Sequence, residues 1–221
     1  MSKPKLNPEK RSHKRGNVTR QLIIDKTAVL LNQKGYAALT MDDILEATGL
    51  KKGALYNHFK DKEALCCEAH RYACQMHARI LSEYVQENLK KGKFGAKDKL
   101  IAHIDGFMAL TQKPGVPGGC PLFNMAMQTA EIARLPELGS QIPLALRETV
   151  LSGLNHWSLS LQGIVSEGKM TQEIQASQSA SNVSAIIIST LEGALIMTRL
   201  YQSWDPLETA AAHLKSWITS L

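Results

Sequence analysis

The sequence is poor in the features that mark several common protein classes. It has only four cysteines, 5% aromatic residues and no apolar run near the roughly 18 residues that span a bilayer. It contains no glycine-rich phosphate loop, H-E-x-x-H motif, nucleophile elbow or paired-carboxylate pattern. The basic N-terminus lacks the apolar core of a secretory signal. We therefore expect a cytoplasmic protein that is not an enzyme, holds no cofactor and makes no membrane contact.

The cysteines predict neither a disulfide framework nor a metal centre. Without an export signal we expect reduced thiols. Cys66, His70, Cys74 and His77 follow one another at intervals of four, four and three, so they share one face of a helix. A metal site there is the alternative, but ligands on one straight helix spread over about 16 Å of rise. A partly buried helix flank is the simpler interpretation, and we predict no metal.

Hydrophobic periodicity runs along almost the whole chain, which is 221 residues long and 44% hydrophobic. Apolar residues recur at steps of three and four, with no sustained alternation typical of strands and no internal repeat. Glycine, proline and capping residues divide the pattern into about nine helices, so the predicted fold is all-α. The expected helices cover residues 18–34, 40–49, 51–59, 63–89, 100–111, 121–133, 142–168, 179–202 and 206–221.

Positive charge is concentrated at the N-terminal end. Residues 1–62 hold 13 lysines and arginines against six acidic residues, whereas residues 63–221 hold 13 against 14. This asymmetry points to an anionic partner at that end, and a solubilising tail is the alternative. We expect a flexible basic arm at 1–16, a small helical domain at 17–62 and a larger helical domain at 63–221.

The most informative segment lies between Thr40 and Lys62. Thr40 and Asp43 are spaced as a capping box, and Gly49 follows the short helix that they begin. A second short helix then starts at Lys51 with two lysines, where the helix dipole disfavours cations unless a phosphate lies nearby. Two short helices around a tight turn predict a helix-turn-helix, whose second helix enters the major groove of DNA.

Residues 18–65 resemble the DNA-binding domain of the tetracycline-repressor (TetR) family. The resemblance is carried by Lys34-Gly-Tyr36, Thr40-Met-Asp-Asp-Ile44 and the run from Thr48 to Leu65, TGLKKGALYNHFKDKEAL. It implies DNA contacts, mostly to phosphates for Thr40, Tyr56 and Lys62. Base contacts are expected at Lys51, Ala54 and Asn57, and the small Ala54 favours shape readout or contact with a thymine methyl. The complete implied set is Thr40, Lys51, Lys52, Gly53, Ala54, Tyr56, Asn57, His58 and Lys62.

Two of these residues have a structural alternative. Tyr56 could pack within its short helix instead of donating to phosphate. His58 could cap against the neighbouring helix.

The resemblance implies that the larger domain binds a small-molecule effector and forms a homodimer. Gly119-Cys-Pro-Leu-Phe-Asn-Met-Ala126 and Leu191-Glu-Gly-Ala194 resemble segments of the family's C-terminal domain. The last two helices are expected to form the dimer, with internal core as the alternative. The candidates for the ligand cavity, with plain core as the alternative for each, are His103, Phe107, Met108, Phe123, Met125, His156 and Trp157.

These expectations describe a repressor that a small molecule releases from double-stranded operator DNA. One alternative is redox or electrophile sensing at Cys120, where a helix N-terminus is expected to lower the pKa of the thiol. The other is a DNA-binding protein that has no effector.

Overall fold

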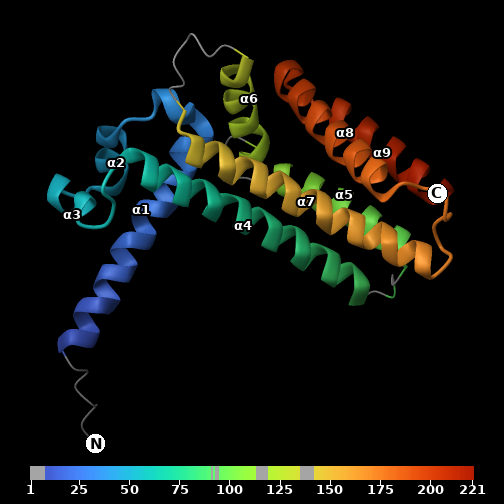
Figure 1. The fold of residues 1–221 in the computed structure, drawn as a ribbon, viewed down its shortest axis with the longest axis horizontal. Coiled ribbons are helices and arrows are strands. Elements are labelled where there is room, and N and C mark those ends of the chain that lie inside the picture. The colour runs from blue at the N-terminus through green and yellow to red at the C-terminus, as the bar shows by residue number, and fades with distance from the viewer. Residues whose placement is uncertain (1–7, 91, 93–94, 113–118, 135–141) are drawn as a thin grey trace, which may run out of the picture.

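The computed structural model describes residues 8–90, 92, 95–112, 119–134 and 142–221. This part of the chain contains helices and no strand, which confirms the predicted all-α fold with about nine helices (Figure 1). The helices are α1 (Pro8–Ala38), α2 (Met41–Thr48), α3 (Lys52–Tyr56), α4 (Lys62–Lys90), α5 (Ala96–Gln112), α6 (Pro121–Arg134), α7 (Leu144–Met170), α8 (Ala180–Tyr201) and α9 (Asp205–Ser220).

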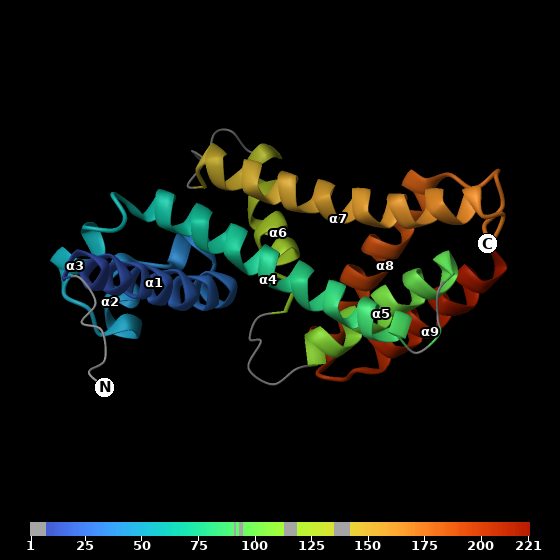
Figure 2. The ribbon, with the colours of Figure 1, turned by 90° about the horizontal axis from the view of Figure 1, so that it is seen from below.

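The helices form a head (α1–α3) and a body (α4–α9). Figure 2 shows α4 leaving the head and running along the body towards α5 and α9. The body core gathers side chains from α4, α5, α7, α8 and α9. The head core is closed by side chains from outside residues 17–62, since Met125 of α6 and Leu146 and Val150 of α7 belong to it. The two regions therefore share a packed boundary, through which a change in α6 or α7 reaches the head.

The first helix begins earlier than expected. We predicted a flexible arm through residue 16 and a helix from about residue 18, but α1 starts at Pro8. That prediction is wrong for residues 8–16, because proline suits a first helical turn and the lysines and arginines that follow are good helix formers. Residues 1–7 of the predicted arm lie outside the described part. The predicted stop at Gly35 is confirmed, because its φ of 77° and ψ of 167° are not helical and kink α1 at this residue.

Helix α8 is the most apolar element of the body. Among the described helices it alone has the length and composition of a membrane-crossing segment, with a mean hydropathy of 1.5. It buries Val183, Ile187 and Leu191 in the body core and packs against α7 and α9. Its apolar character is thus used in part for packing inside the protein.

Candidate nucleic-acid interface and internal cavity

The start of α2 is fixed by a capping box. The Thr40 hydroxyl accepts from the backbone N–H of Asp43 at 3.1 Å, and the Asp43 carboxylate accepts from the N–H of Thr40 at 2.8 Å. The Lys34 ammonium donates to the same carboxylate at 2.6 Å. Hydrogen bonds from Lys34 and Thr40 lower the pKa of Asp43 to about 2. These contacts tie α2 to the end of α1, as the sequence predicted for Thr40 and Asp43.

One side of α3 packs into the head core, and its other side faces the solvent. Gly49 ends α2 with φ 66°, a left-handed conformation that favours glycine, and the extended Lys51 leads into α3. Leu55 and Phe59 are buried in the head core. The residues expected to contact DNA lie on the accessible side. Thr40, Lys51, Lys52, Gly53, Tyr56 and Asn57 are exposed, and Ala54, His58 and Lys62 are half-buried.

Gly53 is not required by packing within the protein. A Cβ placed on it meets no atom within 4 Å, and its φ is not in the left-handed region. Glycine inside a helix costs about 0.5–1 kcal/mol relative to alanine. The bare backbone at Gly53 therefore leaves open space above α3 that packing within the protein does not use.

Aromatic rings orient the cations around this face. The Lys62 ammonium lies 4.3 Å from the centre of the Tyr36 ring, and the Lys52 ammonium lies 5.9 Å from that of Tyr56. Asp61 caps α4 by accepting from the N–H of Ala64 at 2.7 Å. Lys62 is therefore the first residue of a capped helix.

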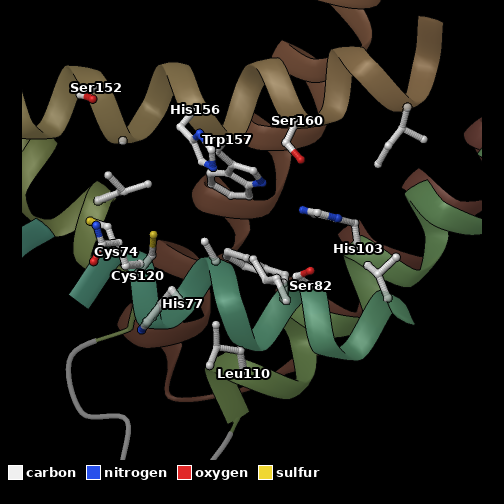
Figure 3. Close-up of a pocket in the computed structure, with 18 of the residues that line it drawn as sticks. Cys74, His77, Ser82, His103, Leu110, Cys120, Ser152, His156, Trp157 and Ser160 are labelled. Atoms are coloured by element: carbon white, nitrogen blue, oxygen red, sulfur yellow. The ribbon is translucent and has the colours of Figure 1, made fainter. Parts of the chain in front are cut away.

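The body encloses a cavity of about 800 Å³ between α4, α5, the start of α6 and α7 (Figure 3). This volume lies in the range that holds drug-sized ligands. Phe107 and Trp157 stack on one wall, with ring centres 5.8 Å apart and planes inclined by 14°. Apolar side chains complete the lining, namely Ala78, Leu81, Val85, Leu110, Leu122 and Ile164.

Polar side chains line the cavity beside the apolar ones, and Arg71, Lys99 and Glu167 among them are charged residue types. Burial lowers the pKa of His77 and of His103 to about 4. Within the described residues, Nδ1 of His103 and Nε1 of Trp157 are buried without a hydrogen-bond partner. Lys99 and Glu167, which also line the cavity, form an ion pair with each other. The cavity lining thus includes two buried polar atoms without a partner in the described residues, one ion pair and the exposed Arg71.

Helix α6 connects the cavity to the head. Its start supplies Cys120 and Leu122 to the cavity wall. One turn on, Nδ2 of Asn124 donates to Oδ1 of Asn32 at 2.7 Å, and Nδ2 of Asn32 donates to the carbonyl of Gly119 at 3.1 Å. Nη1 of Arg199 on α8 donates to the same Asn124 at 3.0 Å. These hydrogen bonds connect the start of α6 to α1 and to α8.

Comparison with known proteins settles the family. Residues 23–69 match the model for "Bacterial regulatory proteins, tetR family", and residues 96–214, more than half of the chain, match the "Tetracyclin repressor-like, C-terminal domain". The chain belongs to the tetR family. It is accordingly a DNA-binding regulator of transcription, and the predicted resemblance is confirmed.

Solved structures of tetR regulators share the whole fold. One from Chloroflexus aurantiacus J-10-FL is 33% identical, with a TM-score of 0.74 over 93% of this chain and 96% of that one. Another, from Cytophaga hutchinsonii, is 25% identical, with a TM-score of 0.77 over 94% and 96%. The repressor NemR of Escherichia coli K12 is 21% identical over 91% of this chain and 94% of its own length.

The cavity contains four of the seven residues predicted to line it in this tetR regulator. His103, Phe107, His156 and Trp157 line it, whereas Met108, Phe123 and Met125 do not. Met108 and Phe123 pack against the body core, and Met125 is buried in the head core. Helical spacing shows only that a residue faces inwards. It does not show that Met125 enters the other core, or that Met108 and Phe123 pack against the body core away from the cavity.

The sequence reasoning missed the contribution of α4. On this helix Met76 is 37% exposed, whereas Cys66 and His70 are buried. Cys74 and His77, which continue the face with Cys66 and His70, line the cavity. The four-four-three spacing of cysteines and histidines did mark this face, but these polar residue types suggested a flank.

The alternative of an activated thiol at Cys120 is not favoured by its surroundings. The thiol lies at the start of α6, and the N–H groups of Leu122 and Phe123 do favour its thiolate. Complete burial and the neighbouring Glu192 outweigh them and raise the pKa of Cys120 well above its usual value. Burial in a low dielectric costs a thiolate more than one helix terminus returns.

Proposed function

We propose that this tetR-family regulator represses transcription as a homodimer and leaves its operator when a small molecule occupies the cavity. The observation that carries the proposal is the α3 face, where accessible lysines, polar side chains and a bare Gly53 lie together. Relatives named as repressors, among them NemR of Escherichia coli and DhaR of Mycobacterium sp. strain GP1, support the negative sign of regulation.

On DNA, α3 would lie in the major groove with its N-terminal end towards the bases. Lys51, Ala54 and Asn57 would contact bases, and Thr40, Tyr56 and Lys62 would hold phosphates on either side. Lys52 and His58 would add contacts to the backbone. The half-burial of Ala54 and His58 leaves only part of each side chain for DNA, which favours shape readout over many direct base contacts.

The dimer would form through α8 and α9. The outer side of α8 and the turn after it expose large apolar groups: Ile186, Met197, Leu200, Tyr201 and Trp204. The Gly193 backbone has open space above it, so a partner helix could approach closely. A symmetric pair would present two copies of α3 to half-sites about 34–36 Å apart. A cytoplasmic location follows from this role.

Effector control would run through α6. A ligand that pushes on Cys120 and Leu122 shifts the helix that holds Asn32 of α1 through Asn124. It would therefore favour the arrangement of heads that does not fit the operator. Direct sensing by the Cys120 thiol is the weaker candidate, because its raised pKa keeps it protonated. A regulator without an effector would leave a cavity of this size unexplained.

The experiment begins with selection of bound duplexes from a random pool, followed by affinity measurements on the recovered sequence. Lys52→Ala should weaken binding to all sequences by about tenfold and reduce the salt dependence by about one ion. Lys90→Ala is the matched control. It also removes one exposed lysine, but from the C-terminal end of α4, away from α3. Equal losses in both variants, or a chain that binds no duplex at low salt, would contradict the proposal.

A further inference from the structure

The two unpartnered polar atoms of the cavity indicate which chemical groups its ligand carries. His103 belongs to α5 and Trp157 to α7, and Figure 3 shows their rings pointing towards each other across the cavity. Trp157 is 8% exposed and His103 is half-buried, and the two unpartnered nitrogen atoms themselves are buried. Leaving a buried donor or acceptor without a partner costs about 1–3 kcal/mol. Groups placed in this way find their partner when a ligand lies between them.

The shape of the lining specifies an aromatic molecule. The stacked rings of Phe107 and Trp157 supply aromatic surface to the lining, and Leu81, Leu110 and Leu122 add aliphatic surface from α4, α5 and α6. Planar rings bury the largest apolar area against such a surface and gain from offset stacking. The cavity is large enough for a molecule of three linked or fused rings.

The charges around the cavity specify a neutral molecule. Lys99 and Glu167 balance each other, and Arg71 lines the cavity from an exposed position on α4. Glu192 contacts the Cys120 thiol but does not itself line the cavity. A charged ligand would lie near His77 and His103, whose pKa values burial lowers to about 4, and an unpaired buried charge is very costly.

We propose that the cavity binds uncharged planar aromatic molecules that carry one oxygen, which accepts a hydrogen bond from Nε1 of Trp157. A ligand hydroxyl would in addition donate to Nδ1 of His103. The proposal rests on the proposed effector role of this cavity and adds the chemical class of the effector.

Matched tricyclic probes on the full-length protein test the proposal by calorimetry. They are fluorene, 9-fluorenone, 9-fluorenol, fluorene-9-carboxylate and an aminomethylfluorene. Fluorenone and fluorenol should bind about five- to tenfold more tightly than fluorene, which is the effect of one satisfied buried donor. The carboxylate and the ammonium should bind at least about tenfold more weakly than fluorenone because of their desolvation.

Trp157→Phe is the decisive variant, because it keeps an aromatic ring against Phe107 and removes only the indole N–H. It should abolish the preference for fluorenone over fluorene while fluorene affinity stays the same. Trp217→Phe, a half-buried tryptophan of α9 outside the cavity lining, should keep the preference. If Trp157→Phe does not fold, His103→Leu replaces it and should lower the affinity for fluorenol towards that for fluorenone.

The outcomes separate the ligand class from the effector role. Tighter binding of the carboxylate or the ammonium, an unchanged ketone preference in Trp157→Phe, or no binding of any neutral probe would overturn the ligand class. Operator release is measured separately with the same compounds. If fluorenol binds as expected and the operator stays bound, the effector role fails and the ligand class stands.

Discussion

The outer face of the head favours the charged form of an acidic side chain, whereas the interior of the body favours neutral forms of its titratable side chains. At the head, contacts from Lys34 and Thr40 lower the pKa of Asp43 to about 2, so its charged form is favoured. In the body, burial lowers the pKa of His70, His77 and His103 to about 4 and raises that of Glu192 to about 7. This difference suits a protein that binds an anionic polymer at the surface of its head and a neutral molecule in the cavity of its body.

The largest effect expected from this contrast lies at Glu192. The pKa of its carboxyl is raised from 4.5 to about 7, mainly by burial, and Cys120 and Arg199 oppose this shift. Because the native pKa is above the unfolded one, the native state favours the proton. Stability should fall as the pH rises from about 4.5 to about 7 and then level off, by about 3–4 kcal/mol in total.

Urea denaturation of the wild type and of Glu192→Gln between pH 5 and pH 8.5 measures this effect. The neutral amide should remove this pH-dependent loss. The histidines contribute with the opposite sign, since their stabilisation is lost as the pH falls from about 6.5 to about 4. They are present in both proteins, so the difference between the two curves isolates Glu192. Parallel curves would show that the body does not exclude charge at this position.

The next largest effect separates stability from function in the head. Gly53→Ala should stabilise the protein by up to about 0.5–1 kcal/mol, since its Cβ meets no atom within 4 Å. The same methyl group should lower operator affinity by about tenfold, because it occupies the space where α3 approaches the duplex. Thermal denaturation and fluorescence anisotropy on a labelled operator give the two values.

Gly163→Ala in α7 is the control for this change, because a Cβ there also meets no atom within 4 Å. It should give a similar gain in stability with unchanged operator affinity. If both alanine variants bind the operator as tightly as the wild type, close approach at Gly53 is not used.

The head could be predicted nearly residue by residue, whereas the body could be predicted only as helices. Caps and turns such as Thr40, Gly49 and Asp61 act within a few residues, so their spacing in the sequence specifies their contacts. The cavity depends on which helices face each other. The sequence marked Met125 and Phe107 alike as inward-facing, but Met125 lies in the head core and Phe107 in the cavity wall. No local spacing distinguishes these two destinations.

The smallest expected effect tests whether local capping works equally well in both regions. Asp61 caps α4 beside the head, and Ser179 caps α8 in the body by accepting from the N–H of Asn182 at 3.3 Å. Removing such an acceptor typically costs about 1 kcal/mol. Asp61→Ala should show that loss in thermal denaturation, and Ser179→Ala should show less, because its hydrogen bond is longer. A larger loss at Ser179 would mean that the start of α8 is stabilised by its cap more than by the packing that surrounds the helix.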